Sequence, residues 1–232
     1  MFPPWLHSLA LAMLTLGVVC AIGVGIRVVQ RPERMPVMNV VWPVCALFGG
    51  VLVVLAYRRL AMPASRGARN RRPSFPAAVA KGTLHCGSGC TLGDLAAEWL
   101  AFAVPAVATG FGWHWLFEEK TFAVWGLDFV FAFLLGIVFQ YFAIAPMRGL
   151  SFREGVAAAV KADALSLAAW QAGMYGGMAL LQFGFFRHAC GHIAPVDTPE
   201  FWFAMQLAML AGFATAYPVN GWLIRRGIKE AM

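Results

Sequence analysis

The chain has 232 residues, of which 60% are hydrophobic and only 12% are charged. Soluble domains carry about twice that share of charged residues, roughly 25%. The composition therefore excludes an ordinary soluble enzyme and indicates a protein whose solvent is lipid. The formal net charge of +7 indicates a surplus of Lys and Arg that contacts the anionic membrane surface. We do not take it as a sign of nucleic-acid binding.

Six stretches are apolar and long enough to cross a bilayer as helices, which takes about 20 residues each. In chain order they are residues 5–26, 37–57, 92–113, 122–145, 155–184 and 201–223. The first stretch lacks the basic start and the small-residue cleavage site of a secretory signal, so we expect it to be retained as a span. The sequence predicts an all-α membrane protein with six transmembrane helices.

A basic segment, residues 58–82, divides the chain. It is rich in Arg, Pro, Ser and Ala, which is typical of a flexible cytoplasmic linker. Before it, residues 1–57 predict an N-terminal helix pair with hardly any charge inside the membrane. After it, residues 83–232 predict a four-helix unit that carries nearly every polar residue at membrane depth, so we expect the chemistry there.

The basic residues also predict which side each loop occupies. Those of the linker, of the loop after the fourth span and of the C-terminal tail fall on one side if six helices cross. Because Lys and Arg collect in cytoplasmic loops, we expect a multi-pass protein of the inner (plasma) membrane with both termini cytoplasmic. Arg27, Arg31 and Arg34 disagree with this topology, since it puts them in an external loop.

A row of polar residues opens the third predicted span, in the stretch HCGSGCTLGDLAAEW. Cys86, Cys90, Asp94 and Glu98 are each four residues apart, so on a helix they form one stripe running inward from the cytoplasmic side. His85 is next to Cys86 and points away from the stripe unless the first turn is unwound. Alternatively, the glycines between them serve only close helix packing, which leaves Asp94 and Glu98 unexplained.

The two thiols of this stripe suggest a soft metal. Thiolates on one helix face suit Cu(I) first and zinc second, and a helix N-terminus favours the thiolate form. We therefore expect Cys86 and Cys90 to be reduced, close together and accessible from the cytoplasm, where they would bind one Cu(I) ion.

Two further groups extend the metal hypothesis. His188, Cys190 and His192 alternate along a loop, and in an extended backbone their side chains would share one face; an ordinary polar loop fits equally well. Met174 and Met178 are four apart in the fifth span, where they would relay Cu(I), although methionine in an apolar helix more often serves packing.

Three more charged residues fall at membrane depth, namely Asp128, Lys161 and Asp163. Lys161 and Asp163 are two apart and so do not face each other on a helix. We expect Lys161 to pair with Glu98 or Asp94, in a structural ion pair or as part of the site. The excess of acids over lysine favours a cation as the species handled.

Three blocks carry a family resemblance. They read HCGSGCTLGDLAAEW, KADALSLAAWQAGMYGGMAL and MQLAMLAGFATAYPVNGWLIRRGIKEAM. They resemble a bacterial and archaeal membrane family, domain of unknown function 4396, over about residues 83–232. The resemblance implies an integral membrane protein and brings no established activity. The family's Cys-x-x-x-Cys block matches Cys86 and Cys90, its Gly-Asp matches Gly93 and Asp94, and the acid after it matches Glu98.

The leading hypothesis is a membrane protein that binds and moves Cu(I), with the bilayer, the metal and a metal-handling protein or a second copy of the chain as its partners. One alternative is a membrane thiol or quinone redox enzyme in which Cys86 and Cys90 cycle between dithiol and disulfide. Another is an accessory structural subunit. The sequence holds no haem-attachment CxxCH, dinucleotide-binding glycine pattern or nucleotide loop, so an enzyme is not the leading interpretation.

Overall fold

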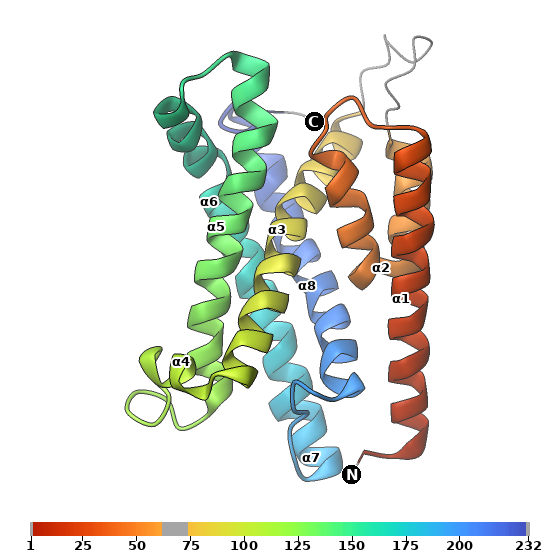
Figure 1. Ribbon diagram of the computed structural model, residues 1–232, viewed down its shortest axis with the longest axis vertical. Helices are drawn as coiled ribbons and strands as arrows, with labels where there is room; N and C mark the ends of the chain where they lie inside the picture. Colours follow the sequence, from red (N-terminus) through yellow and green to blue (C-terminus); the bar gives the residue numbers. More distant parts are fainter. Residues whose placement is uncertain (1, 62–73, 231–232) are drawn as a thin grey trace.

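A bundle of long helices makes up the computed structural model, which describes residues 2–61 and 74–230 (Figure 1). No β-strand occurs in this part of the chain. The elements in order are α1 (Pro4–Gln30), α2 (Met38–Leu60), α3 (Phe75–Ala103), α4 (Pro105–Gly110), α5 (Lys120–Arg148), α6 (Phe152–Ala179), the π-helix η2 (Leu180–Phe186), α7 (Arg187–Cys190) and α8 (Pro199–Arg225).

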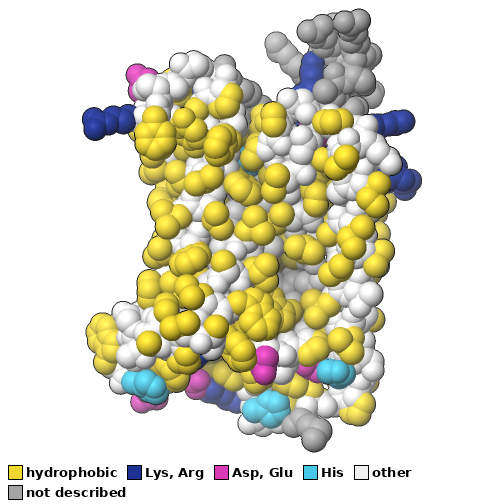
Figure 2. Space-filling view, viewed as in Figure 1, with side chains coloured by type: hydrophobic (Ala, Val, Ile, Leu, Met, Phe, Trp, Pro, Cys, Tyr) yellow, Lys and Arg dark blue, Asp and Glu magenta, His cyan; other side chains and the backbone are white. Residues whose placement is uncertain are grey.

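The composition of the helices suits a membrane. Four of them, α1, α2, α5 and α8, are long and apolar enough to cross one. The side wall of the bundle is covered by hydrophobic side chains, whereas the ionisable ones gather at its two ends (Figure 2). Large apolar side chains such as Val29, Leu134 and Leu180 are exposed on this wall. Such a surface is unfavourable in water and favourable in lipid.

The central helix is α3, which packs against α2, α5, α6 and α8. Its approach to α5 requires glycine. A Cβ at Gly89 would lie 2.7 Å from the Cα of Gly136, and one at Gly93 would lie 2.4 Å from the backbone nitrogen of Ala132. These glycines therefore serve close helix packing, which was one of the two interpretations of the sequence. The acids of the same helix, Asp94 and Glu98, are also buried.

Helix α2 turns back on itself. Gly50 has φ 47° and ψ −127°, which breaks the helical path. Trp42 and Tyr57 would be about 22 Å apart along a straight helix, yet their ring centroids lie 5.5 Å apart. The tip of α2 reaches only midway along the bundle before the chain returns to the end from which it came (Figure 1). The stretch predicted as a second span is thus a hairpin.

This hairpin brings most basic residues to one end of the bundle, which we call the basic end. Arg27 and Arg31 line one cavity with Arg58, the Arg225 guanidinium lies 4.9 Å from the Phe75 ring centroid, and Arg148 pairs with Glu230 at 2.6 Å. The C-terminus lies at this end and the N-terminus at the opposite end (Figure 1). Among the described Lys and Arg residues, only Lys120 and Arg187 lie at the opposite end.

Two predicted boundaries were wrong. The third span was expected over residues 92–113, but α3 begins at Phe75 and ends at Ala103, because Pro105 has no N–H to continue the helix and disfavours helical backbone at Val104. Residues 75–82 of the expected linker are consequently helical, and Lys81 among them is buried. The rest of the linker, residues 62–73, lies outside the described residues.

We predict that Gly50→Ala destabilises the protein by about 1–3 kcal/mol, the usual cost of holding a residue with a side chain in such a backbone conformation. No atom lies within 4 Å of a Cβ built at Gly50, so steric clash adds nothing. The matched control is Gly23→Ala, which also meets nothing within 4 Å and has ordinary helical backbone. Thermal unfolding in detergent should show a loss for Gly50→Ala alone, and equal melting temperatures would contradict the hairpin.

Candidate functional site

Four ionisable side chains are buried along α3, with Lys81 and His85 on one face of the helix and Asp94 and Glu98 on nearly the opposite face. We call Lys81, His85, Asp94 and Glu98 the polar file; each is no more than 4% exposed. Seventeen residues of α-helix span about 26 Å, which is close to the roughly 30 Å thickness of a bilayer core. The file therefore extends through most of the bundle, and partners from other helices divide it into two clusters.

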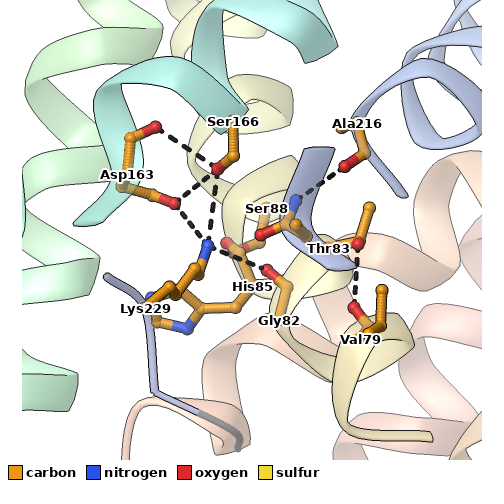
Figure 3. Close-up of polar contacts among 10 residues, drawn as sticks. Val79, Gly82, Thr83, His85, Ser88, Asp163, Ser166, Ala216 and Lys229 are labelled. Atoms are coloured by element: carbon orange, nitrogen blue, oxygen red, sulfur yellow. Dashed lines mark hydrogen bonds and ion pairs between the residues drawn. The ribbon is translucent and has the colours of Figure 1, made fainter. Parts of the chain in front are cut away.

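The cluster near the basic end is built around Lys229, which follows α8 and enters the interior (Figure 3). Its Nζ lies 2.5 Å from Oδ1 of Asp163, and both side chains are fully buried. Ser166 donates to the same Oδ1 at 2.7 Å, and the ammonium also reaches the carbonyl of Gly82 at 3.5 Å. We call Lys229, Asp163, Ser166 and His85 the lysine cluster.

His85 lies beside this ion pair (Figure 3). The side chain is fully buried, and neither ring nitrogen has a hydrogen-bond partner. The sequence analysis placed His85 off the row of Cys86, Cys90, Asp94 and Glu98. It lies in the interior, close enough for its charge to interact with those of Asp163 and Lys229. An imidazole in this position is able to accept or donate a proton on either nitrogen.

The second cluster consists of three acids, Asp94, Glu98 and Asp128, which we call the acid cluster. Asp128 comes from α5 and is close enough for its charge to interact with both acids of α3. Gln171 of α6 donates to Oδ1 of Asp94 at 2.9 Å. Oδ2 of Asp94 and both carboxyl oxygens of Asp128 are buried without a hydrogen-bond partner. Carboxyl groups in such surroundings share protons or bind a cation.

The acid cluster reaches a cavity of about 180 Å³ at the end of the bundle opposite the basic end. Glu98 and Lys120 line it, together with residues 193–196 of the loop before α8. Gln182 of η2 holds that loop by donating to the carbonyl of Ala194 at 3.1 Å and accepting from its N–H at 2.7 Å. The cavity gives the polar file an opening at this end.

Three free thiols lie between the two clusters. Cys86 and Cys90 are neighbours one turn apart on α3, and Cys45 of α2, whose thiol donates to the carbonyl of Leu84 at 3.2 Å, is close to Cys86. Cys90 is near enough to both Asp94 and Asp163 for their charges to act on its thiol, so it lies between the acid cluster and the lysine cluster. The expectation that Cys86 and Cys90 are accessible was wrong, because both are fully buried under α2, α5 and α8.

The other proposed metal ligands do not join these thiols. His188 and Cys190 lie in the helical turn α7, where residues two apart point in different directions, so the extended loop predicted for them was wrong. The His192 ring packs on Phe2 with centroids 4.6 Å apart. Met174 and Met178 are buried in the hydrophobic core. Within residues 2–61 and 74–230, no three His, Cys, Asp or Glu side chains form a group able to hold a metal ion.

Sequence reasoning assigned the wrong lysine to the interior. Lys161 is exposed, so the expectation that it pairs with Glu98 or Asp94 was wrong. Lys229 pairs with a buried acid instead, Asp163. Lys81 is also buried and lies 3.7 Å from Glu33. Both buried lysines had been counted among solvated cytoplasmic residues, since each lies in a basic segment. Gln171 and Gln140, both buried, were missed because a lone glutamine in a helix gives no distinctive pattern.

We predict that Lys229→Met lowers stability by about 3–5 kcal/mol, because it leaves the buried Asp163 carboxylate without its counter-charge. The double variant Asp163→Leu/Lys229→Met should recover most of that loss. Lys161→Met is the matched control, since it removes an exposed lysine from the helix that carries Asp163. Thermal unfolding in detergent measures all of these, and additive losses in the double variant would show that the two residues do not interact.

The comparisons with known proteins give a family and no named relative. The family model described as Domain of unknown function (DUF4396) matches residues 77–229. The match runs from the first turns of α3 to Lys229, so it includes both clusters and leaves out α1 and α2. No curated protein and no solved structure matches the chain.

Proposed function

The chain belongs to the DUF4396 family, and we propose that it is an integral membrane protein that carries protons across the membrane through the polar file of α3. The observation that supports this most is the acid cluster. Three carboxyl groups lie together in the interior, and three of their oxygens have no hydrogen-bond partner. Ionisable residues at membrane depth are costly and typically belong to ion pathways or proton relays.

The arrangement of the groups suits a relay. A proton that enters at the cavity beside Glu98 and Lys120 meets the acid cluster first. Cys90, which interacts with Asp94 and Asp163, follows, and His85 is the next group toward the basic end. At that end the buried ammonium of Lys229 forms an ion pair with Asp163.

For the membrane topology, we propose five crossings, by α1, α3, α5, α6 with η2, and α8, and a re-entrant α2. The basic end then faces the cytoplasm, as Lys and Arg do in most membrane proteins. Arg27, Arg31 and Arg34 join the other basic residues in this scheme, which removes the disagreement in the six-span topology. The N-terminus would be outside and the C-terminus in the cytoplasm, in place of two cytoplasmic termini.

We predict that a reporter active only in the cytoplasm gives signal when fused after Met232 and none when fused before Met1. A reporter inserted between α7 and α8 should be silent, because that loop lies at the end opposite the basic residues. The control is the same reporter inserted in the 62–73 segment, which connects two helix ends at the basic end and should give signal. Signal from both termini would restore the six-span topology.

We predict that the purified protein in liposomes dissipates an imposed pH gradient, measured with an enclosed pH-sensitive dye. Asp94→Asn and Asp128→Asn should each slow the flux at least tenfold, because an amide keeps the shape of a carboxyl group but does not exchange a proton. Lys161→Met and Glu154→Gln are controls at exposed positions. Unchanged flux in both Asn variants, with the proteins folded, would refute the proton relay.

A second candidate is the Cu(I) function, which the neighbouring thiols Cys86 and Cys90 and the nearby Cys45 favour. Thiolates are the ligands that Cu(I) prefers, and one of these residues, Cys45, was not among the ligands expected from the sequence. Copper binding by the wild type that is lost in Cys86→Ser/Cys90→Ser would support this function. If the same double variant keeps full proton flux, the two functions are separate.

A further inference from the structure

The hairpin of α2 leaves a groove in the side of the bundle. Because its tip stops midway, the space beyond the tip between α1, α3 and α8 is filled by no helix. A cavity of about 300 Å³ lies there, within the range of small-molecule sites. It is lined by Leu14 and Val18 of α1, Leu47 and Phe48 of α2, Thr91, Asp94 and Leu95 of α3, and Trp202, Met205, Gln206 and Met209 of α8.

The groove opens on the side wall of the bundle. Val18 is 49% exposed and Leu95 is 38% exposed, so both belong to its rim. The rings of Trp202 and Trp99 stack with centroids 6.0 Å apart, which gives the groove a rigid aromatic border at one end. In a protein that spans a bilayer, an opening between exposed apolar side chains faces the acyl chains, so a ligand would enter from the lipid phase.

The inner end of the groove is polar. Asp94 is fully buried, and its Oδ2 has no hydrogen-bond partner. The Oε1 of Gln206 is buried and lacks a partner as well, while its Nε2 donates to the carbonyl of Leu47 at 2.7 Å. Thr91 already uses its hydroxyl hydrogen, on the carbonyl of Gly87 at 2.7 Å. The groove thus combines an apolar lining with two buried acceptors, from Asp94 and Gln206, that stay unsatisfied.

These features select the chemistry of the ligand. Two unused acceptors call for a group that donates a hydrogen bond. An ammonium would satisfy them only while Asp94 is ionised, and its own desolvation in an apolar groove is costly. A hydroxyl donates its one hydrogen to an ionised Asp94, whereas with a protonated Asp94 it accepts from the carboxyl group and donates to Gln206. It therefore fits in both states and carries no charge.

We propose that this groove binds a membrane-soluble molecule with an apolar body and a hydroxyl head, held by Asp94 and Gln206. The body lies against Leu14, Phe48 and Met205. The head then contacts one member of the acid cluster, so a bound ligand covers one carboxyl oxygen of Asp94. Binding at the groove does not require that the acid cluster carry protons.

The test uses three photoreactive probes that share one diazirine-bearing alkyl chain and end in a hydroxyl, a methyl ether or an ammonium group. The full-length protein in liposomes is illuminated with each, and the labelled peptides are identified by mass spectrometry. We expect the alcohol to label the segments around Leu14 and Met205 about fivefold more than the ether, the ratio that one hydrogen bond supplies. Excess unlabelled long-chain alcohol should compete, and a phenol with the same chain should compete as well.

Variants locate the site. Leu14→Trp fills the groove and should abolish the preferential labelling, whereas Leu165→Trp, at a position 51% exposed on α6 outside the groove, should leave it unchanged. Gln206→Leu should reduce the preference for the alcohol over the ether without removing the apolar labelling. Equal labelling by alcohol and ether in the wild type overturns the proposal, and so does stronger labelling by the ammonium probe. The wild-type comparison needs no variant, so a misfolded variant does not affect it.

Discussion

The close contact of α3 with α5 is the constraint on which the rest of the structure depends. Glycine at positions 89 and 93 lets the two backbones approach to a distance that a Cβ would forbid, and α3 is then enclosed by other helices on its remaining sides. Between Lys81 and Asp94 no residue of this helix is exposed. Its histidine, cysteines and carboxylates are therefore buried, and each needs a partner, a proton or a ligand in the interior.

The buried charges are compensated differently in the lysine cluster and in the acid cluster. In the lysine cluster the charges are balanced, because a tail residue brings an ammonium to the carboxylate of Asp163. In the acid cluster no such balance occurs among the described residues, and the polar partner of Asp94 is the amide of Gln171. A balanced pair is compatible with a purely structural role. Unbalanced carboxyl groups at the same depth reduce stability, which favours a functional role.

The sequence predicted well those features that depend on composition and helical period. Helices α1, α5 and α8 are close to their expected bounds, and the four-residue spacing of Asp94 and Glu98 correctly implied that they share a buried face.

Two errors have a common physical cause. Gly49 and Gly50 fold α2 back, but a glycine pair inside an apolar run is equally compatible with a straight helix. Lys229 enters the interior, but a basic tail is usually solvated. In each case, contacts with helices distant in the sequence determine the structure, and such contacts cannot be predicted from a local sequence pattern.

The turn in α2 has a consequence for the order in which the protein assembles. At the tip, the helical hydrogen bonding is interrupted at Gly50, and the nearby carbonyl of Leu47 is satisfied by Gln206 of α8 at 2.7 Å. An open carbonyl is costly in hydrocarbon. Since α8 follows α3 to α6 in the chain, α2 has no access to that amide while the ribosome is still making those helices. The hairpin tip therefore reaches its final hydrogen bonding only after α8 has been inserted, although its own residues leave the ribosome before those of α8.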